Sequence, residues 1–134
     1  MLKFIYKQPL QKMNYTPKGI RPFIGAKDYQ QSRAFYTELG FEEHVIDASM
    51  SLFKVNEDLG FYLQDYYLKD WIDNSMIFLE VEDVDKCTEE LLAKGLQHKY
   101  ENVRFTGIKR WEWGRELFMH DPSGVLWHFG EFNK

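Results

Sequence analysis

Residues 23–41 read FIGAKDYQQSRAFYTELGF and residues 78–96 read FLEVEDVDKCTEELLAKGL, so one pattern occurs twice with a shift of 55 residues. In each copy an apolar run leads to an aspartate, Asp28 or Asp83, and a glycine, Gly40 or Gly95, follows 12 residues later. A short carboxylate suits the N-cap of a helix, and glycine suits the left-handed residue that ends one. Each copy therefore predicts a strand followed by a helix of about three turns.

Strand-like runs surround both helices. The expected strands cover residues 19–27, 42–46, 49–55 and 61–65 in the first half, and 75–81, 99–106, 117–120 and 125–129 in the second. Turn-forming residues at 56–60 and 121–124 separate neighbouring strands. The order predicts an α+β fold of two βαβββ modules in tandem, with a curved mixed, mostly antiparallel sheet and a central cavity.

The repeat also sets the expected domain boundaries. A single domain covers residues 18–134, with module one at about 18–66 and module two at about 74–132. Residues 1–17 lie outside the pattern and have two interpretations. Leu2, Phe4 and Tyr6 alternate as in an edge strand or arm, or Met13 is the natural start and the preceding residues are an artefact.

Composition narrows the possible functions. With 17 Lys and Arg against 21 Asp and Glu, the net charge of −4 argues against a nucleic-acid partner. No run approaches the roughly 20 apolar residues that span a bilayer, which argues against a membrane protein. The single cysteine, Cys87, excludes an internal disulfide, fits a reducing compartment and is expected to be a buried structural thiol. With no signal-like N-terminus, we expect a cytoplasmic protein.

Aromatic residues make up 17% of the chain, an unusually large share. Two clusters of them exceed the obvious needs of a small core: Tyr62, Tyr66, Tyr67 and Trp71, and the pair Trp111 and Trp113. They suit an aromatic-lined pocket or a dimer face, and plain core packing is an equal alternative.

Two stretches resemble a known family. AKDYQQSRAFYTELGF at 26–41 and WGRELFMHDPSGVLWHFGE at 113–131 resemble the vicinal-oxygen-chelate superfamily of glyoxalases, dioxygenases and bleomycin-resistance proteins. The second stretch is closest in style to the bleomycin-resistance branch. This resemblance covers about residues 18–132 and implies the same paired-module fold. It also implies a homodimer that sequesters a large cationic drug between its subunits.

The resemblance also implies where a divalent metal would bind in the enzymes of the superfamily. The matching positions are Arg21 and Met76 on the strands before the helices, Tyr62 or Gln64 at the end of module one, and His128 on the last strand. Only His128 suits a hard or borderline divalent ion. We therefore expect no metal and no cofactor.

Two further residues have separate interpretations. His120, beside a turn, is expected to be solvated or hydrogen-bonded, and Glu116 is a weaker candidate for the pocket.

The sequence therefore favours a metal-independent binding protein over an enzyme. A flat or cationic small molecule, such as a bleomycin-like drug, is expected to bind an aromatic pocket. The residues expected to bind it are Arg21, Tyr62, Gln64, Tyr66, Tyr67, Trp71, Trp111, Trp113 and His128. One alternative is a metal-dependent lyase, isomerase or dioxygenase with a non-standard metal site. Another is a dimer that binds only a partner protein through its aromatic face.

Overall fold

The computed structural model describes residues 13–134 and contains two modules of the same design. Module one consists of β1 (Phe23–Gly25), α1 (Tyr29–Leu39), β2 (Glu42–Asp47), β3 (Met50–Lys54) and β4 (Gly60–Gln64). Its strands form the first sheet in the order β1-β4-β3-β2, in which only the β1–β4 pair is parallel. The expectation for Leu2, Phe4 and Tyr6 lies outside the described residues.

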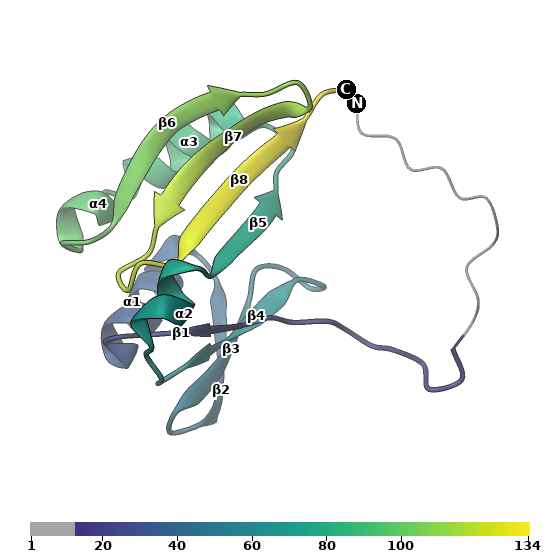
Figure 1. Ribbon diagram of the computed structural model, residues 1–134, viewed down its shortest axis with the longest axis vertical. Coiled ribbons are helices and arrows are strands. Elements are labelled where there is room, and N and C mark those ends of the chain that lie inside the picture. The colour runs from purple at the N-terminus through teal and green to yellow at the C-terminus, as the bar shows by residue number, and fades with distance from the viewer. Residues whose placement is uncertain (1–12) are drawn as a thin grey trace.

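Module two repeats this order after a short connecting helix. It consists of α2 (Lys69–Asp73), β5 (Met76–Glu80), α3 (Val84–Ala93), α4 (Leu96–Lys99), β6 (Arg104–Arg110), β7 (Gly114–His120) and β8 (Leu126–Phe132). Its strands form the second sheet in the order β5-β8-β7-β6, with β5 parallel to β8. The predicted α+β fold of two βαβββ modules is confirmed, with the strands divided between two four-stranded sheets (Figure 1).

The helix caps form where the repeat places them. The Asp28 carboxylate accepts a hydrogen bond from the amide of Gln31 at 3.0 Å, and Asp83 accepts from the amides of Asp85 and Lys86 at 3.0 and 3.1 Å. These contacts satisfy amides that have no partner inside the helix. Gly40 ends α1 in the left-handed region, with φ of 112°.

The strand expected at residues 99–106 is wrong in position. Gly95 is left-handed, with φ of 67°, but it starts the short helix α4 instead of leading directly to a strand. Leu96 and Tyr100 turn into the core, where they are 3% and 6% exposed. This burial holds the segment in a helical turn, so β6 begins only at Arg104 and continues to Arg110.

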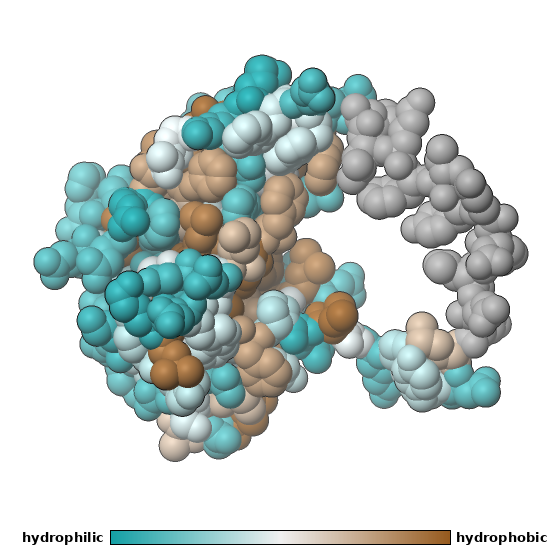
Figure 2. Space-filling view, viewed as in Figure 1, coloured by the Kyte–Doolittle hydropathy of each residue, from teal (hydrophilic) through white to brown (hydrophobic). Residues whose placement is uncertain are grey.

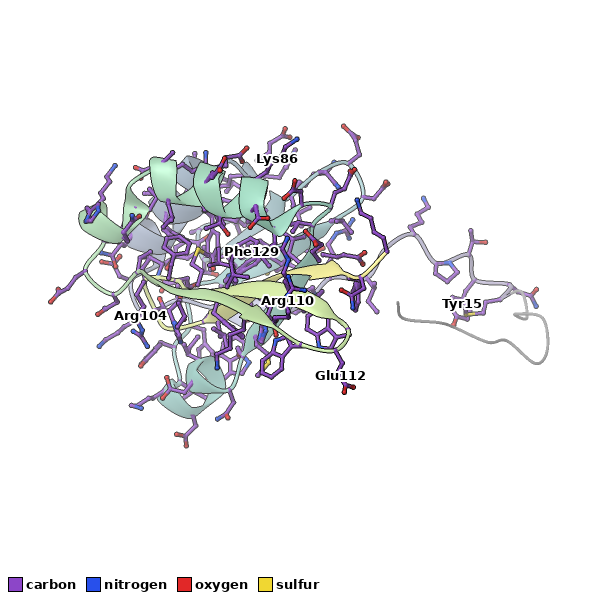
Figure 3. All side chains as sticks on the ribbon, turned by 90° about the horizontal axis from the view of Figure 1, so that it is seen from above. Tyr15, Lys86, Arg104, Arg110, Glu112 and Phe129 are labelled. Carbon is purple, nitrogen blue, oxygen red and sulfur yellow. The ribbon has the colours of Figure 1, made fainter. Side chains whose placement is uncertain are left out.

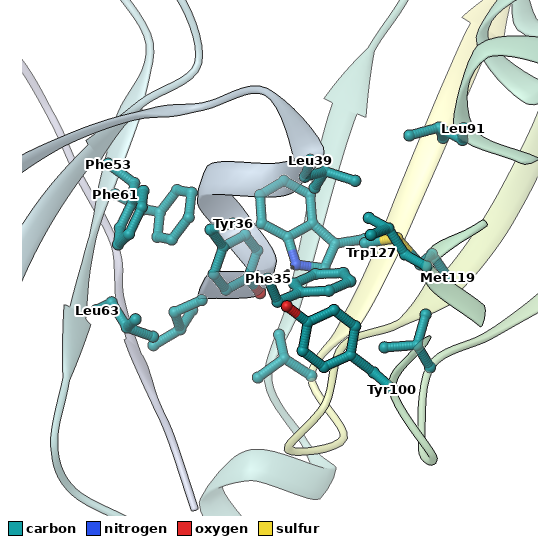
Figure 4. Packing of buried hydrophobic residues seen from close by; sticks show 14 of the residues in the cluster. Phe35, Tyr36, Leu39, Phe53, Phe61, Leu63, Leu91, Tyr100, Met119 and Trp127 are labelled. Carbon is teal, nitrogen blue, oxygen red and sulfur yellow. Dashed lines mark hydrogen bonds between the residues drawn. The ribbon is translucent and has the colours of Figure 1, made fainter. Parts of the chain in front are cut away.

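One continuous hydrophobic core joins the modules (Figure 4). Trp127 of β8 packs against Tyr36 of α1 and Phe61 of β4, with ring centroids 5.8 and 5.4 Å away. The Tyr36 hydroxyl donates to Asp121 at 2.6 Å and accepts from the Trp127 indole at 2.9 Å. Core packing thus accounts for these three aromatic residues. None of the six aromatic residues expected at a pocket or dimer face is fully buried, but Tyr67 and Trp71 also pack against the core.

Each sheet turns one face toward this core, and within residues 13–134 the other face is open except where α2 covers one end of the first sheet. In the second sheet, Trp127 and Phe129 are buried on the core side, and α3 packs there against β7 and β8. Figure 3 shows Phe129 between this sheet and α3. In Figure 1, α3 lies behind the second sheet, so the face toward the viewer is its open face.

Candidate functional site

The open face of the second sheet carries a cluster of aromatic rings. Side chains alternate along a strand, so Phe78, His128 and Phe118, which lie in register on β5, β8 and β7, share this face. The His128 imidazole lies 5.0 Å from the Phe118 ring and 6.2 Å from the Phe78 ring. Trp113 folds over from the β6–β7 turn, with its ring 5.8 Å from Phe78 and 5.1 Å from Phe132. We call Phe78, Trp113, Phe118 and Phe132 the aromatic cluster.

A buried carboxylate lies beside this cluster. Glu116 of β7 is 6% exposed, and its Oε1 lies 2.8 Å from Nδ1 of His128. A carboxylate in its ionised form can only accept, and in that form the contact requires a proton on Nδ1. The other ring nitrogen of His128, Nε2, is buried and has no hydrogen-bond partner within residues 13–134. A buried polar atom without a partner is costly and needs an explanation.

A second histidine on the same face has the same feature. His120 pairs with Leu126 in the β7–β8 ladder, and its Nδ1 is buried without a hydrogen-bond partner in the described part of the chain. Burial lowers the pKa of His120, and the nearby charge of Arg104 lowers it further. At neutral pH this imidazole is therefore uncharged. The expectation of a solvated or hydrogen-bonded His120 does not hold for this nitrogen.

The open face of the first sheet is simpler. Phe23 of β1 stacks on Tyr62 of β4, with ring centroids 4.9 Å apart. Gln64 lies on the same face of β4, two residues further along. At the end of this face Trp71 of α2 covers Gly25 so closely that a Cβ there would lie 2.6 Å from its ring.

The nine residues expected to bind the ligand fall into two sets, one on or beside each sheet. Tyr62 and Gln64 lie on the first sheet, and Arg21 is exposed just before β1. Tyr66, Tyr67 and Trp71 follow β4, where the Tyr66 and Trp71 rings are 5.9 Å apart. His128 and Trp113 lie on the second sheet, and Trp111 is exposed in the β6–β7 turn.

A groove of about 490 Å³ lies where the modules meet (Figure 2). Its lining is mainly apolar and includes Pro22, Leu59, Phe78 and Trp127. None of the nine nominated residues lines it. Their convergence on one ligand therefore remains a prediction.

Sequence reasoning missed much of the aromatic cluster. Phe78, Phe118 and Phe132 were not nominated, and Glu116 was a weak candidate only. The signal that could have found Phe78 is its position two residues after Met76 on one strand, which places both on the same face. Phe118 requires the pairing of β7 with β8, which a single sequence does not reveal.

The residues at the metal-ligand positions of the superfamily do not fit a divalent ion. Arg21, Met76, Tyr62 or Gln64, and His128 provide one imidazole beside a guanidinium, a thioether and a phenol or amide. Among residues 13–134 no three His, Cys, Asp or Glu side chains are grouped to hold a metal. Cys87 is also an unsuitable nucleophile, because burial raises its pKa to about 11 and keeps it a thiol at neutral pH.

A sequence model of the Glyoxalase/Bleomycin resistance protein/Dioxygenase superfamily matches residues 20–129. The chain belongs to this superfamily. A search of curated proteins finds no match. Within residues 13–134 there is no helix with the length and apolar character needed to cross a membrane.

Solved structures share the fold of this superfamily member. One is a bleomycin-binding protein from bleomycin-producing Streptomyces verticillus complexed with copper(II)-bleomycin, with TM-score 0.71, 22% identity and coverage of 99% of this chain and 100% of that chain. A bleomycin resistance determinant encoded on the transposon Tn5 has TM-score 0.74, 20% identity and coverage of 88% and 100%. Lactoylglutathione lyase from Agrobacterium tumefaciens has TM-score 0.64, 19% identity and coverage of 86% and 94%.

Proposed function

We propose that this protein binds and sequesters a flat, cationic small molecule on the open face of its second sheet, without a metal or other cofactor. One observation carries the proposal: two rings of the aromatic cluster, Phe78 and Phe118, flank an imidazole that is backed by the buried carboxylate of Glu116, and Trp113 and Phe132 extend the cluster beyond Phe78. Aromatic faces attract planar cations, and a carboxylate in a partly dehydrated site favours positive charge. Structural neighbours that bind bleomycin support this choice of ligand class.

We further propose that the protein acts as a homodimer in the cytoplasm. Both open faces leave large apolar side chains uncovered: Phe23 is 48% exposed, Met76 62% and Phe78 44%. A second copy would cover part of these faces and turn a shallow surface into an enclosed site. The lone cysteine supports a reducing compartment. Light scattering on a sizing column tests the dimer, and a monomer at micromolar concentration would contradict it.

The first experiment is a tryptophan-fluorescence titration with bleomycin, both metal-free and copper-loaded, after treatment with a chelator. We expect saturable quenching, because Trp113 belongs to the aromatic cluster and Trp111 lies 43% exposed in the adjacent turn. Trp113→Ala is expected to weaken binding at least about tenfold, since truncating a tryptophan that anchors a binding site typically costs about 2 kcal/mol or more.

Trp71→Phe compares the two sheets, because it changes a candidate tryptophan on the other sheet and keeps a ring above Gly25. A loss in Trp71→Phe as large as that in Trp113→Ala would contradict a site confined to the second sheet. No quenching at all would reject this drug as the ligand. Stoichiometric zinc, nickel, cobalt or manganese in the purified protein would instead favour a glyoxalase-type enzyme.

A further inference from the structure

His120 and His128 each have one buried ring nitrogen without a hydrogen-bond partner within residues 13–134, and that of His128 belongs to a ring held by a buried carboxylate. The side chain is 17% exposed, yet Nε2 itself is buried and makes no hydrogen bond within the described residues. Its other nitrogen is fixed by Glu116 at 2.8 Å. A carboxylate or carbonyl contact usually fixes the tautomer of a histidine whose remaining nitrogen binds a partner. His128 has this arrangement without the partner.

The neighbouring groups determine what that partner can be. When Nδ1 donates to Glu116 and the ring carries this single proton, Nε2 is an acceptor, and in that state its partner must donate a hydrogen bond. Glu116 on β7 and Glu80 on β5 share one row of the open face and flank β8, which carries His128. Of the cationic residues of this face, Arg104 lies further along the outer strand β6. Lys109 is in register with Glu116, but its ammonium group lies over the Trp111 ring, 5.7 Å from the centroid. The central strands therefore favour a cation over an anion or a neutral group.

We propose that Nε2 of His128 accepts a hydrogen bond from a planar N–H cation of the amidinium or guanidinium class. The cation lies among the rings of the aromatic cluster, and Glu116 holds His128 in the accepting tautomer. This inference rests on the proposed function, because it names the polar contact within the same site. It makes His128 a residue that determines specificity and Glu116 a positioning residue.

Phe78 is the ring beside His128 on β5, with the two ring centroids 6.2 Å apart. It is the most exposed ring of the aromatic cluster, and it lies over Gly130, where a Cβ would be 2.2 Å from its ring atoms. In the proposed complex Phe78 rotates away from Gly130 and opens the space beside His128. The ligand's own ring then replaces the displaced phenyl group against Trp113 and Phe132.

Two probes of similar shape test the contact in the wild-type protein. Benzamidinium carries N–H donors on a planar cation, whereas phenyltrimethylammonium is an aromatic cation without them. Nitrogen-15 NMR of the histidines is expected to show Nε2 of His128 unprotonated in the free protein. Benzamidinium should shift this resonance saturably and bind at least about tenfold more tightly, as expected for a hydrogen bond to a charged donor. Equal affinity for both probes, or a proton on Nε2 in the free protein, would overturn the inference.

Three variants distinguish loss of the His128 hydrogen bond from a general loss of stability. His128→Phe keeps an aromatic ring and removes the acceptor, and we expect the preference for benzamidinium over phenyltrimethylammonium to disappear. Glu116→Gln should reduce this preference and mix the two tautomers in the NMR spectrum. His98→Phe, on the exposed side of α4, is the matched control and should change neither. A preference that persists in His128→Phe would contradict the assignment even if the variant is less stable.

The bleomycin titration distinguishes this inference from the proposed function. Saturable bleomycin binding with an unmoved Nε2 resonance would reject the His128 contact and leave drug binding intact. A benzamidinium response without bleomycin binding would support the contact and reject the drug.

Discussion

The open faces of the two sheets share one backbone pattern but carry different chemistry. In the first sheet Phe23 lies in register with Tyr62, and in the second Phe78, 55 residues later, lies in register with His128. On β3 of the first sheet, Met50 lies in register with Gln64, two residues after Tyr62. On β7 of the second sheet, Glu116 has the matching position, in register with Gly130, two residues after His128. The same framework therefore stacks two rings on one sheet and builds a carboxylate-backed imidazole on the other.

The turns that come after β3 and β7 differ in the same way. Asn56 lies on the surface and accepts hydrogen bonds from the amides of Asp58 and Leu59, both at 2.9 Å. Asp121 is fully buried, and one of its oxygens accepts from the three amides of Ser123, Gly124 and Val125. Its other oxygen accepts from Tyr36 of module one. The position of a surface turn in module one is thus occupied by a bridge between modules in module two.

The largest expected effect comes from breaking this bridge. Asp121→Ala leaves three amides and the Tyr36 hydroxyl buried without their acceptor, and we expect a loss of about 4 kcal/mol in the free energy of unfolding. Asn56→Ala, its surface counterpart, should cost less than about 1 kcal/mol. Urea denaturation of both variants at neutral pH measures the difference. Similar losses of unfolding free energy would mean that the two turns contribute equally to stability, which would contradict the bridge.

The buried turn at Asp121 should also make stability depend on pH, which the surface turn at Asn56 cannot do. Burial raises the pKa of Asp121 to about 6 and outweighs its hydrogen bonds, which lower it. The unfolded chain releases this proton near pH 4, so the contribution of Asp121 to stability is full below that pH and is lost as pH rises through 6. A shift from about 4 to 6 corresponds to roughly 3 kcal/mol at 1.4 kcal/mol per unit.

Asp121→Asn is the reference for this measurement, since the amide does not titrate. We expect the wild-type protein to lose stability relative to Asp121→Asn between pH 4 and 7. The comparison also cancels Glu38, Glu43 and Asp83, whose lowered pKa values make stability fall as pH drops. A constant difference across this range would show that folding does not raise the pKa of Asp121.

Much of the fold could be predicted because its signals are local. The caps at Asp28 and Asp83 and the glycine at 40 define the helices within one turn of chain, and alternation marks the strands around them. The failure at residues 99–106 has a local origin too. Gly95 adopts the expected left-handed conformation, but the burial of Leu96 and Tyr100 keeps the next residues in a helical turn.

The candidate site was harder to predict from the sequence, because it depends on strand pairings between distant segments. His128 could be nominated from the resemblance, and it does lie on an open face. Its contact with Glu116 depends on the β7–β8 register, and its contact with Phe78 depends on the parallel β5–β8 pair. The bridge between Tyr36 and Asp121 spans 85 residues and has no signal in either segment alone.

The smallest expected effect concerns the glycines beneath the covering rings of each sheet. A Cβ at Gly25 would lie 2.4 Å from the backbone oxygen of Tyr66, which cannot move away without disturbing the end of β4. The three atoms nearest to a Cβ at Gly130 all belong to the ring of Phe78, a side chain that is 44% exposed and could move more easily than backbone. We expect Gly25→Ala to cost about 2 kcal/mol of unfolding free energy and Gly130→Ala about half as much, as in other overpacked sites. Urea denaturation compares the two, and nitrogen-15 NMR of Gly130→Ala should show a changed His128 resonance as Phe78 leaves its place. A larger loss in Gly130→Ala than in Gly25→Ala would mean that Phe78 is fixed rather than able to open the second sheet.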